Sequence, residues 1–153
     1  MDEANIALQS VGQRIIDASA EAVIFADRDG LIRLWNRGAE LIFGYASSEV
    51  EGRSLDLIIP ERLRQAHWDA FNRCLETGRT QHTDRVLTTR SIHKNGARLY
   101  VDLSFGLVKD DADSVVGAFA IGRDCTARYL AAGEIKLRVK ALEAQLDAAK
   151  RAT

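Results

Sequence analysis

The stretch PERLRQAHWDAFNRCLETG, residues 60–78, decides how the rest of the chain is arranged. It begins with the only proline of the sequence and ends on a glycine, residues typical of the first and last turns of a helix. Apolar residues recur within it every three or four positions, so one side of the predicted helix faces a core. These residues are Leu63, Ala66, Ala70, Phe71, Cys74 and Leu75.

His67 lies on the apolar side of this predicted helix, between Leu63 and Phe71. An imidazole in that position cannot point freely into water. It must be hydrogen-bonded in the core, face a cavity, or bind a metal or cofactor. These alternatives imply different functions, and the helix pattern alone leaves all three open.

Length, charge and cysteine content narrow the class of protein. The chain has 153 residues, enough for one domain, and 46% of them are hydrophobic, so it should form a core. A net charge of −1 indicates no nucleic-acid-binding surface. No apolar run approaches the roughly 18–20 residues of a membrane span, and the N-terminus lacks a secretory signal pattern. Cys74 and Cys125 form neither a disulfide framework nor a metal motif. We therefore expect a cytoplasmic protein that binds neither nucleic acid nor membranes.

Segments with strand-like patterns flank the central helix on both sides. Two of them precede it and are joined by a turn ending at Gly30. Asn36 then caps a short helix, and further short helical pieces lead to residue 60. Three strands follow the helix, the first two joined by a turn at Asn95-Gly96. The five predicted strands are Ala22–Asp27, Leu31–Trp35, Thr83–His93, Leu99–Leu107 and Val115–Arg123.

Helices with apolar stripes are predicted at both chain ends. Residues 1–22 form an amphipathic helix that lies either on its own domain or against a second subunit. The helix that begins near Thr126 has a coiled-coil spacing, which favours a dimer contact because a lone helix would expose its stripe. The stripes are Leu8, Val11, Ile15, Ala18 and Ala22 in the first helix, and Ile135, Val139, Leu142, Leu146 and Ala149 in the second.

The predicted order of elements indicates an α+β fold with a five-stranded antiparallel sheet and helices on one face. A ligand would lie between the helices and the sheet. Motifs across residues 17–126 resemble those of PAS domains: DASAEAVIFADRDGLIRLWN, AELIFGY, EGRSLDLIIPE, HKNGARLYVDLSFG and VVGAFAIGRDCT. The closing Arg123-Asp124-Cys125-Thr126 resembles the Asp-x-Thr ending after which this family continues into an output helix.

The resemblance implies a sensory PAS domain in residues 22–126, with an amphipathic helix in residues 1–21 and a coiled-coil helix in residues 127–153. Around the central helix the sequence is similar to the PAS branch that holds haem b, as in bacterial oxygen-sensing histidine kinases. Pro60-Glu61 precedes His67 by the interval of this branch, and an aspartate follows as Asp69, one residue later than in the branch. The resemblance therefore implies that His67 is the iron ligand and that Arg73 lies near a haem propionate.

Other residues are assigned by the same resemblance. His82 lies close to where the branch has a second propionate-facing histidine. Arg85 resembles the arginine that hydrogen-bonds bound oxygen, in an alignment that needs a two-residue length change before Asn95-Gly96. Leu103 and Phe105 would line the distal side of the haem. The implied signal is oxygen or another diatomic gas.

The sequence also bears on functions other than haem binding. Flavin photochemistry of the light-oxygen-voltage type needs a cysteine in a turn that here reads Gly52-Arg53-Ser54-Leu55, so a flavin adduct is excluded, whereas a non-covalent flavin is not. The main alternative is a haem-free PAS domain that mediates protein–protein contacts. No catalytic or phosphate-binding motif is present, so we expect no enzymatic activity. We expect a homodimer that passes its signal to a separate or fused output protein, for example a kinase.

Overall fold

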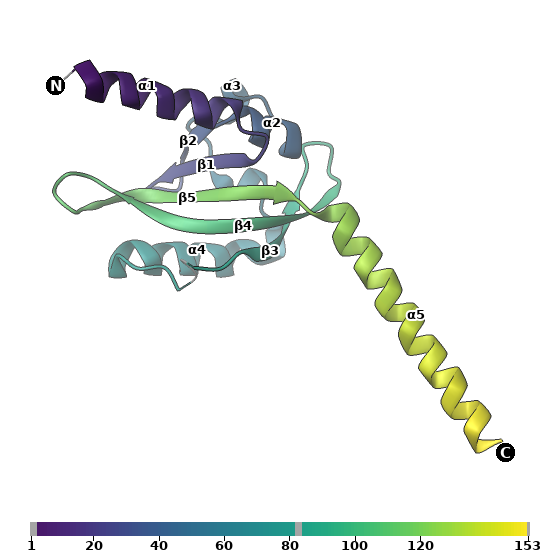
Figure 1. Ribbon diagram of the computed structural model, residues 1–153. Coiled ribbons are helices and arrows are strands. Elements are labelled where there is room, and N and C mark those ends of the chain that lie inside the picture. Colours follow the sequence, from purple (N-terminus) through teal and green to yellow (C-terminus); the bar gives the residue numbers. More distant parts are fainter. Residues whose placement is uncertain (1–2, 82–83, 153) are drawn as a thin grey trace.

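The structure is a computed structural model that describes the backbone of residues 3–81 and 84–152, with side chains from residue 9 onward (Figure 1). Its helices and strands follow the predicted order. They are α1 (Glu3–Ala18), β1 (Ala22–Asp27), β2 (Ile32–Trp35), α2 (Arg37–Phe43), α3 (Ser47–Val50), the 3-10 helix η1 (Leu55–Leu57), α4 (Glu61–Thr77), β3 (Leu87–Ile92), β4 (Arg98–Lys109), β5 (Val115–Asp124) and α5 (Thr126–Arg151).

The five strands form one antiparallel sheet in the order β2-β1-β5-β4-β3, which confirms the predicted sheet. β3 lies at an edge, pairs with β4 only, and is tied at its end by the amide of Ile92, which donates to the carbonyl of Ile58 at 3.0 Å. β3 is shorter than predicted, because residues 84–86 have no strand structure and residue 83 lies outside the described residues.

The side chains of β4 alternate between the two faces of the sheet, as a strand requires. Leu99, Val101 and Leu103 are buried in the main core, and Val101 is only 1% exposed. The intervening Tyr100 and Asp102 project from the opposite face, so the predicted half-buried strand is confirmed.

Asn36 joins three elements near the start of the domain. Its side-chain amide donates to the carbonyl oxygens of Ile16 at 2.8 Å and Glu21 at 2.9 Å, and its oxygen accepts from the amide of Ala39 at 3.0 Å. The predicted helix cap is thus confirmed. α1 ends at Ala18 rather than at residue 22, because Ala22 pairs with Gly122 in the sheet.

Helix α4 begins and ends where its proline and glycine predict, with Pro60 as N-cap and Gly78 in the left-handed conformation at φ 63°. Trp68 ties α4 to η1, because its indole nitrogen donates to the carboxylate of Asp56 at 2.8 Å. The same ring covers Gly30, where a Cβ would lie 2.3 Å from it. Trp68 therefore serves packing, and α4 is held with His67 facing the sheet.

Helix α5 projects away from the domain (Figure 1). Its predicted apolar stripe is exposed along the helix, at 65% for Ile135 and 56% for Leu142. No helix in residues 3–81 and 84–152 combines the length and apolar character needed to cross a membrane.

Candidate ligand-binding site

A cavity of about 580 Å³ lies between α4, η1 and the sheet. This volume falls within the range of about 300–1,000 Å³ that is usual for small-molecule sites. Its walls are mainly apolar and come from the helices and from β1, β3, β4 and β5. Representative lining residues are Ile24, Ile58, Leu63, Leu103, Phe105 and Ala120. The cavity occupies the place between helices and sheet where the element order predicts a ligand.

His67 is the histidine that lines this cavity. Its ring lies edge-on to Trp68 with centroids 4.8 Å apart, and it stacks at 6.1 Å on Phe71. Nδ1 is buried, and the described residues supply no hydrogen bond to it. The imidazole is thus positioned by packing and not by a polar partner.

Burial lowers the pKa of His67 below its usual value, and the negative charge of Asp56 opposes this shift only in part. The imidazole is therefore neutral at neutral pH. A neutral ring has a free lone pair and can bind a metal, whereas the protonated ring cannot. This chemistry suits an axial ligand of haem iron.

The predicted site residues separate into two groups. His67, Leu103 and Phe105 come together at the cavity wall. Arg73 on α4 and Arg85 before β3 are exposed and do not border the cavity. His82 lies outside the described residues, so its predicted role has no structural counterpart.

Two arginines without a predicted role lie at the cavity. Arg62 in the first turn of α4 and Arg90 on β3 both border it. Together with Arg98 they also line an adjoining hollow of about 430 Å³. Within the described ranges none of the three forms an ion pair. The position of Arg62 beside Pro60 could have suggested this location, but Arg90 depends on β3 lying next to the start of α4.

A family model described as PAS fold matches residues 16–130. The chain belongs to the PAS family. A PAS domain is a sensory module, which agrees with a ligand cavity between its helices and its sheet.

Two relatives match part of this PAS domain. An uncharacterised protein of Azorhizobium caulinodans is 31% identical over 97 residues, which is 63% of this chain and 13% of that protein. The oxygen sensor protein DosP of Escherichia coli K12 is 29% identical over 105 residues, which is 69% of this chain and 13% of that protein. The chain therefore corresponds to one segment of much longer relatives.

Solved structures share the fold. The PAS domain of a Colwellia psychrerythraea protein superposes with a TM-score of 0.69 at 20% identity, over 78% of this chain and 98% of that chain. An RNA-binding light-oxygen-voltage receptor superposes with a TM-score of 0.70 at 18% identity, over 92% of this chain and 39% of that chain. At these identities the similarity establishes the architecture and leaves the ligand open.

Proposed function

We propose that this PAS domain binds haem b through His67 and senses a diatomic gas, oxygen in the first place. The observation that carries the proposal is a neutral imidazole at the wall of an apolar cavity, with a buried Nδ1 that the described residues leave without a hydrogen bond. A buried nitrogen without a partner costs free energy. A ligand bond at the imidazole gives this ring the polar partner that its surroundings lack.

The donor set supports haem over a free metal ion. Nowhere in the described ranges do three histidine, cysteine, aspartate or glutamate side chains come together as a metal site. Haem iron needs only one protein ligand because the porphyrin supplies the others, and it offers an open position for a gas when it is bound. The similarity to the oxygen sensor protein DosP supports oxygen as the gas.

The polar end of the cavity supports a ligand with carboxylates. Arg62 and Arg90 border the cavity, and Arg98 joins them in the adjoining hollow. The positive charge of Arg62 would offset a haem propionate through charge-assisted hydrogen bonds, whereas the guanidinium of Arg90 lies over the Tyr100 ring on the outer face of the sheet. Arg73, which the family resemblance implies for this role, is exposed away from the cavity.

Titration of the purified protein with hemin tests the proposal. The parent protein should give a Soret band that shifts when carbon monoxide is added to the reduced sample. His67→Ala should bind hemin about a hundredfold more weakly, a loss of ~2.7 kcal/mol. His93→Ala is the control, because His93 does not border the cavity. A parent protein that retains no hemin after it is separated from an excess, and shows no Soret shift with carbon monoxide, would refute haem binding and favour the haem-free interaction module.

The carboxylate contacts are tested by exchanging single arginines for glutamine. Arg62→Gln should weaken hemin binding by about tenfold, because a charge-assisted hydrogen bond contributes roughly 1.5–3 kcal/mol. Arg37→Gln on α2 is the control, since Arg37 is exposed and does not border the cavity. A loss confined to Arg73→Gln would contradict this assignment and support the one implied by the family resemblance.

We also propose that a second copy of this chain covers the apolar stripe of α5. Ile135, Val139, Leu142 and Leu146 are all exposed on this 26-residue helix. Most of the stability of a helix in a protein comes from packing of its apolar face, so packing against an identical stripe would stabilise α5 as a coiled coil. The dimer would then present its helices to an output protein such as a kinase, separate or fused.

Light scattering tests the dimer. The parent protein should have the mass of a dimer, and Leu142→Asp combined with Leu146→Asp should weaken it. Leu137→Asp is the matched control, because Leu137 is 71% exposed on the same helix but lies outside the stripe. A parent protein that is monomeric at high micromolar concentration would refute the proposal.

A further inference from the structure

The outer edge of β3 carries backbone groups that the described residues leave unpaired. The amide of Ile92 points away from β4 and donates to the carbonyl of Ile58 at 3.0 Å. Because backbone groups alternate in direction along an antiparallel strand, those of Arg90 and Thr88 also point away from β4. The described backbone supplies no partner to either residue on that side. Their N–H and C=O groups therefore face solvent at the edge of the sheet, where both residues are exposed.

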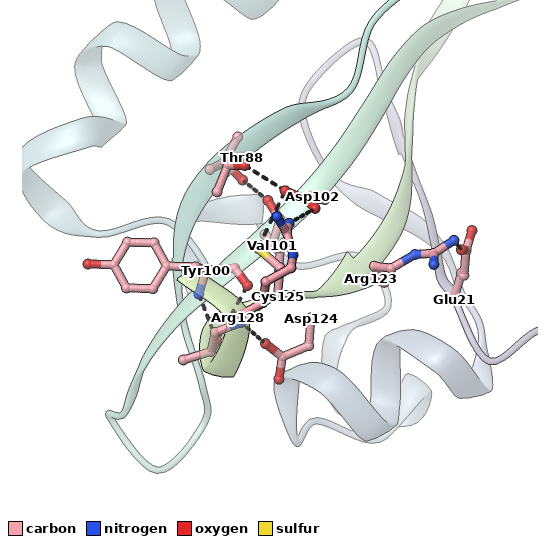
Figure 2. Close-up of polar contacts among 11 residues, drawn as sticks. Glu21, Thr88, Tyr100, Val101, Asp102, Arg123, Asp124, Cys125 and Arg128 are labelled. Atoms are coloured by element: carbon pink, nitrogen blue, oxygen red, sulfur yellow. Dashed lines mark hydrogen bonds and ion pairs between the residues drawn. The ribbon is translucent and has the colours of Figure 1, made fainter. Parts of the chain in front are cut away.

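The backbone of Tyr100 on β4 supports this direction. Tyr100 is the residue opposite Arg90. Its carbonyl accepts from the amide of Cys125 at 2.8 Å, and its amide donates to the hydroxyl of Thr126 at 2.9 Å (Figure 2). Both partners follow β5, which lies on the other side of β4 from β3. The backbone of Tyr100 is thus engaged on that side and does not pair with the backbone of Arg90.

Side chains on the outer face of the sheet hold β3 in an extended form. The hydroxyl of Thr88 donates to the carboxylate of Asp102 at 2.6 Å (Figure 2). The guanidinium carbon of Arg90 lies 5.9 Å from the centre of the Tyr100 ring. A strand that pairs with β3 therefore meets a preformed edge, which lowers the entropy cost of binding.

Positive charge gathers at the end of this edge. The hollow of about 430 Å³ is lined by Arg62 from the first turn of α4, by Arg90 from β3 and by Arg98 from β4. Within the described ranges none of these arginines forms an ion pair. A neighbouring hollow is lined by Arg62 and by one acidic residue, Glu61. The arginines thus outnumber the acidic residues around the end of β3.

We infer that the edge of β3 binds an extended acidic segment of a partner protein, which adds a strand to the sheet. In this mode of recognition, main-chain hydrogen bonds give affinity and side chains give specificity. A free anion would pair with the arginines alone, whereas a peptide backbone also offers the N–H group that the carbonyl of Arg90 lacks. A second copy of β3 is disfavoured as the occupant, because it would bring the arginines of both copies together.

The geometry of the edge predicts where the segment carries its charge. The segment pairs with the backbone of Thr88 and Arg90 and ends before Ile92, whose amide is already bonded. Side chains of a strand alternate between its two faces. Neighbouring acidic residues would therefore reach Arg90 and Arg98 on the outer face and Arg62 on the side of α4. The inference requires no ligand in the cavity.

Fluorescence anisotropy with the full chain tests binding, and the probe is the labelled peptide acetyl-Val-Glu-Asp-Val-Glu-Val-amide. Its analogue with Gln and Asn in place of the acidic residues should bind about tenfold more weakly or less. Arg98→Glu should weaken binding of the acidic peptide by about tenfold or more, because it replaces an attraction by a repulsion. Arg37→Glu is the matched control, since Arg37 is exposed and follows β2 at the opposite edge of the sheet. Melts followed by circular dichroism check that both variants fold.

Two N-methylated forms of the peptide separate strand addition from attraction between charges. The first form is methylated at every second amide, and the second form at the amides in between. Only one of these two rows can face β3. One form should therefore bind about tenfold more weakly, and the other should bind like the unmodified peptide. Equal affinities of the two forms would overturn the inference, because a strand at the edge uses one row only.

Amide exchange measured by nuclear magnetic resonance locates the bound peptide. The amides of Thr88 and Arg90 should exchange about tenfold more slowly in the complex, because they gain hydrogen bonds. Those of Thr89 and Ser91 should change little, since by the same alternation they already face β4. Absence of binding at millimolar peptide, or binding without protection of Thr88 and Arg90, would overturn the inference.

Discussion

The two faces of β4 differ in chemistry although their residues alternate along one strand. On the inner face Leu103 and Phe105 border an apolar cavity. On the outer face Asp102 holds a group of polar side chains against α5. Alternation alone places a ligand wall and a helix-docking surface one residue apart.

The cavity and the outer face of β4 favour different charge states of their titratable side chains. At the cavity that the inner face borders, burial lowers the pKa of His67 on α4 and favours the neutral ring. On the outer face, the hydrogen bond from Thr88 is the main cause that lowers the pKa of Asp102, aided by Cys125 and Arg128 and opposed by burial. Burial and the nearby Asp102 raise the pKa of the Cys125 thiol, so it stays protonated and can donate. The inner face thus selects uncharged groups, and the outer face stabilises a carboxylate.

The largest difference in the free energy of unfolding should appear when a carboxylate is placed on each face of β4 in turn. Leu103→Asp buries a carboxylate among apolar residues and should lower the free energy of unfolding by about 4 kcal/mol or more. Ser104→Asp places it on the outer face and should cost about 1 kcal/mol, because Ser104 is half-buried and loses only its bond to Ile121. Thermal melts followed by circular dichroism compare the two. Equal losses would show that Leu103 is accessible to water.

Removal of the outer carboxylate should have the next largest effect. Asp102→Ala leaves Thr88, Cys125 and Arg128 without their acceptor and should lower the free energy of unfolding by about 1–3 kcal/mol. Hemin affinity should change far less than it does in His67→Ala. Asp69→Ala is the control, since Asp69 is exposed on α4 and, among the described residues, accepts a hydrogen bond from Gln65 alone. Denaturation by urea measures the loss, and equal loss in both variants would contradict a special role for Asp102.

Acid should act on the two faces in separate pH ranges. The folded pKa of His67 lies below its unfolded value of 6.5, so the unfolded state binds a proton first and stability falls as the pH drops from 6.5 towards the folded pKa. The folded pKa of Asp102 lies below 3.8, so its contribution is present above 3.8 and is lost as the pH falls through the folded pKa. His67→Gln should remove the upper decrease from the ligand-free protein, and Asp102→Asn should make the lower one smaller, because Asp27 and Glu49 also have a lowered pKa and contribute to it. Melting temperatures across about pH 2–8 test this, and one decrease that neither variant alters would contradict it.

The smallest expected effect compares two neighbouring threonines of β3. Thr88→Val removes the 2.6 Å hydrogen bond to Asp102 and should cost about 1 kcal/mol. Thr89→Val removes only a 3.4 Å contact to the carbonyl of Val101 and should be close to neutral. Urea denaturation separates the two variants. A larger loss for Thr89→Val would show that the hydroxyl of Thr88 does not contribute to the outer group.

Local patterns predicted the order and type of the elements of this protein, but not the start of β3 or the end of α1. The apolar spacing between Pro60 and Gly78 predicts α4, and the alternation in β4 predicts which of its residues face the core. Asn36 predicts the start of α2 through its cap. These features depend on backbone geometry within a few residues, which is why they can be read from the chain. The predicted apolar side of α4 also places His67 among the residues that face inward.

Contacts between distant segments required the tertiary structure. That Nδ1 of His67 is buried without a partner among the described residues depends on the segments that surround the cavity. Arg62 and Arg90 border the same cavity because α4 begins beside the edge strand β3. Thr88 reaches Asp102 only through the register of β3 against β4. Sequence spacing carries no record of such pairings, because they depend on which strands become neighbours and where α5 leaves the sheet.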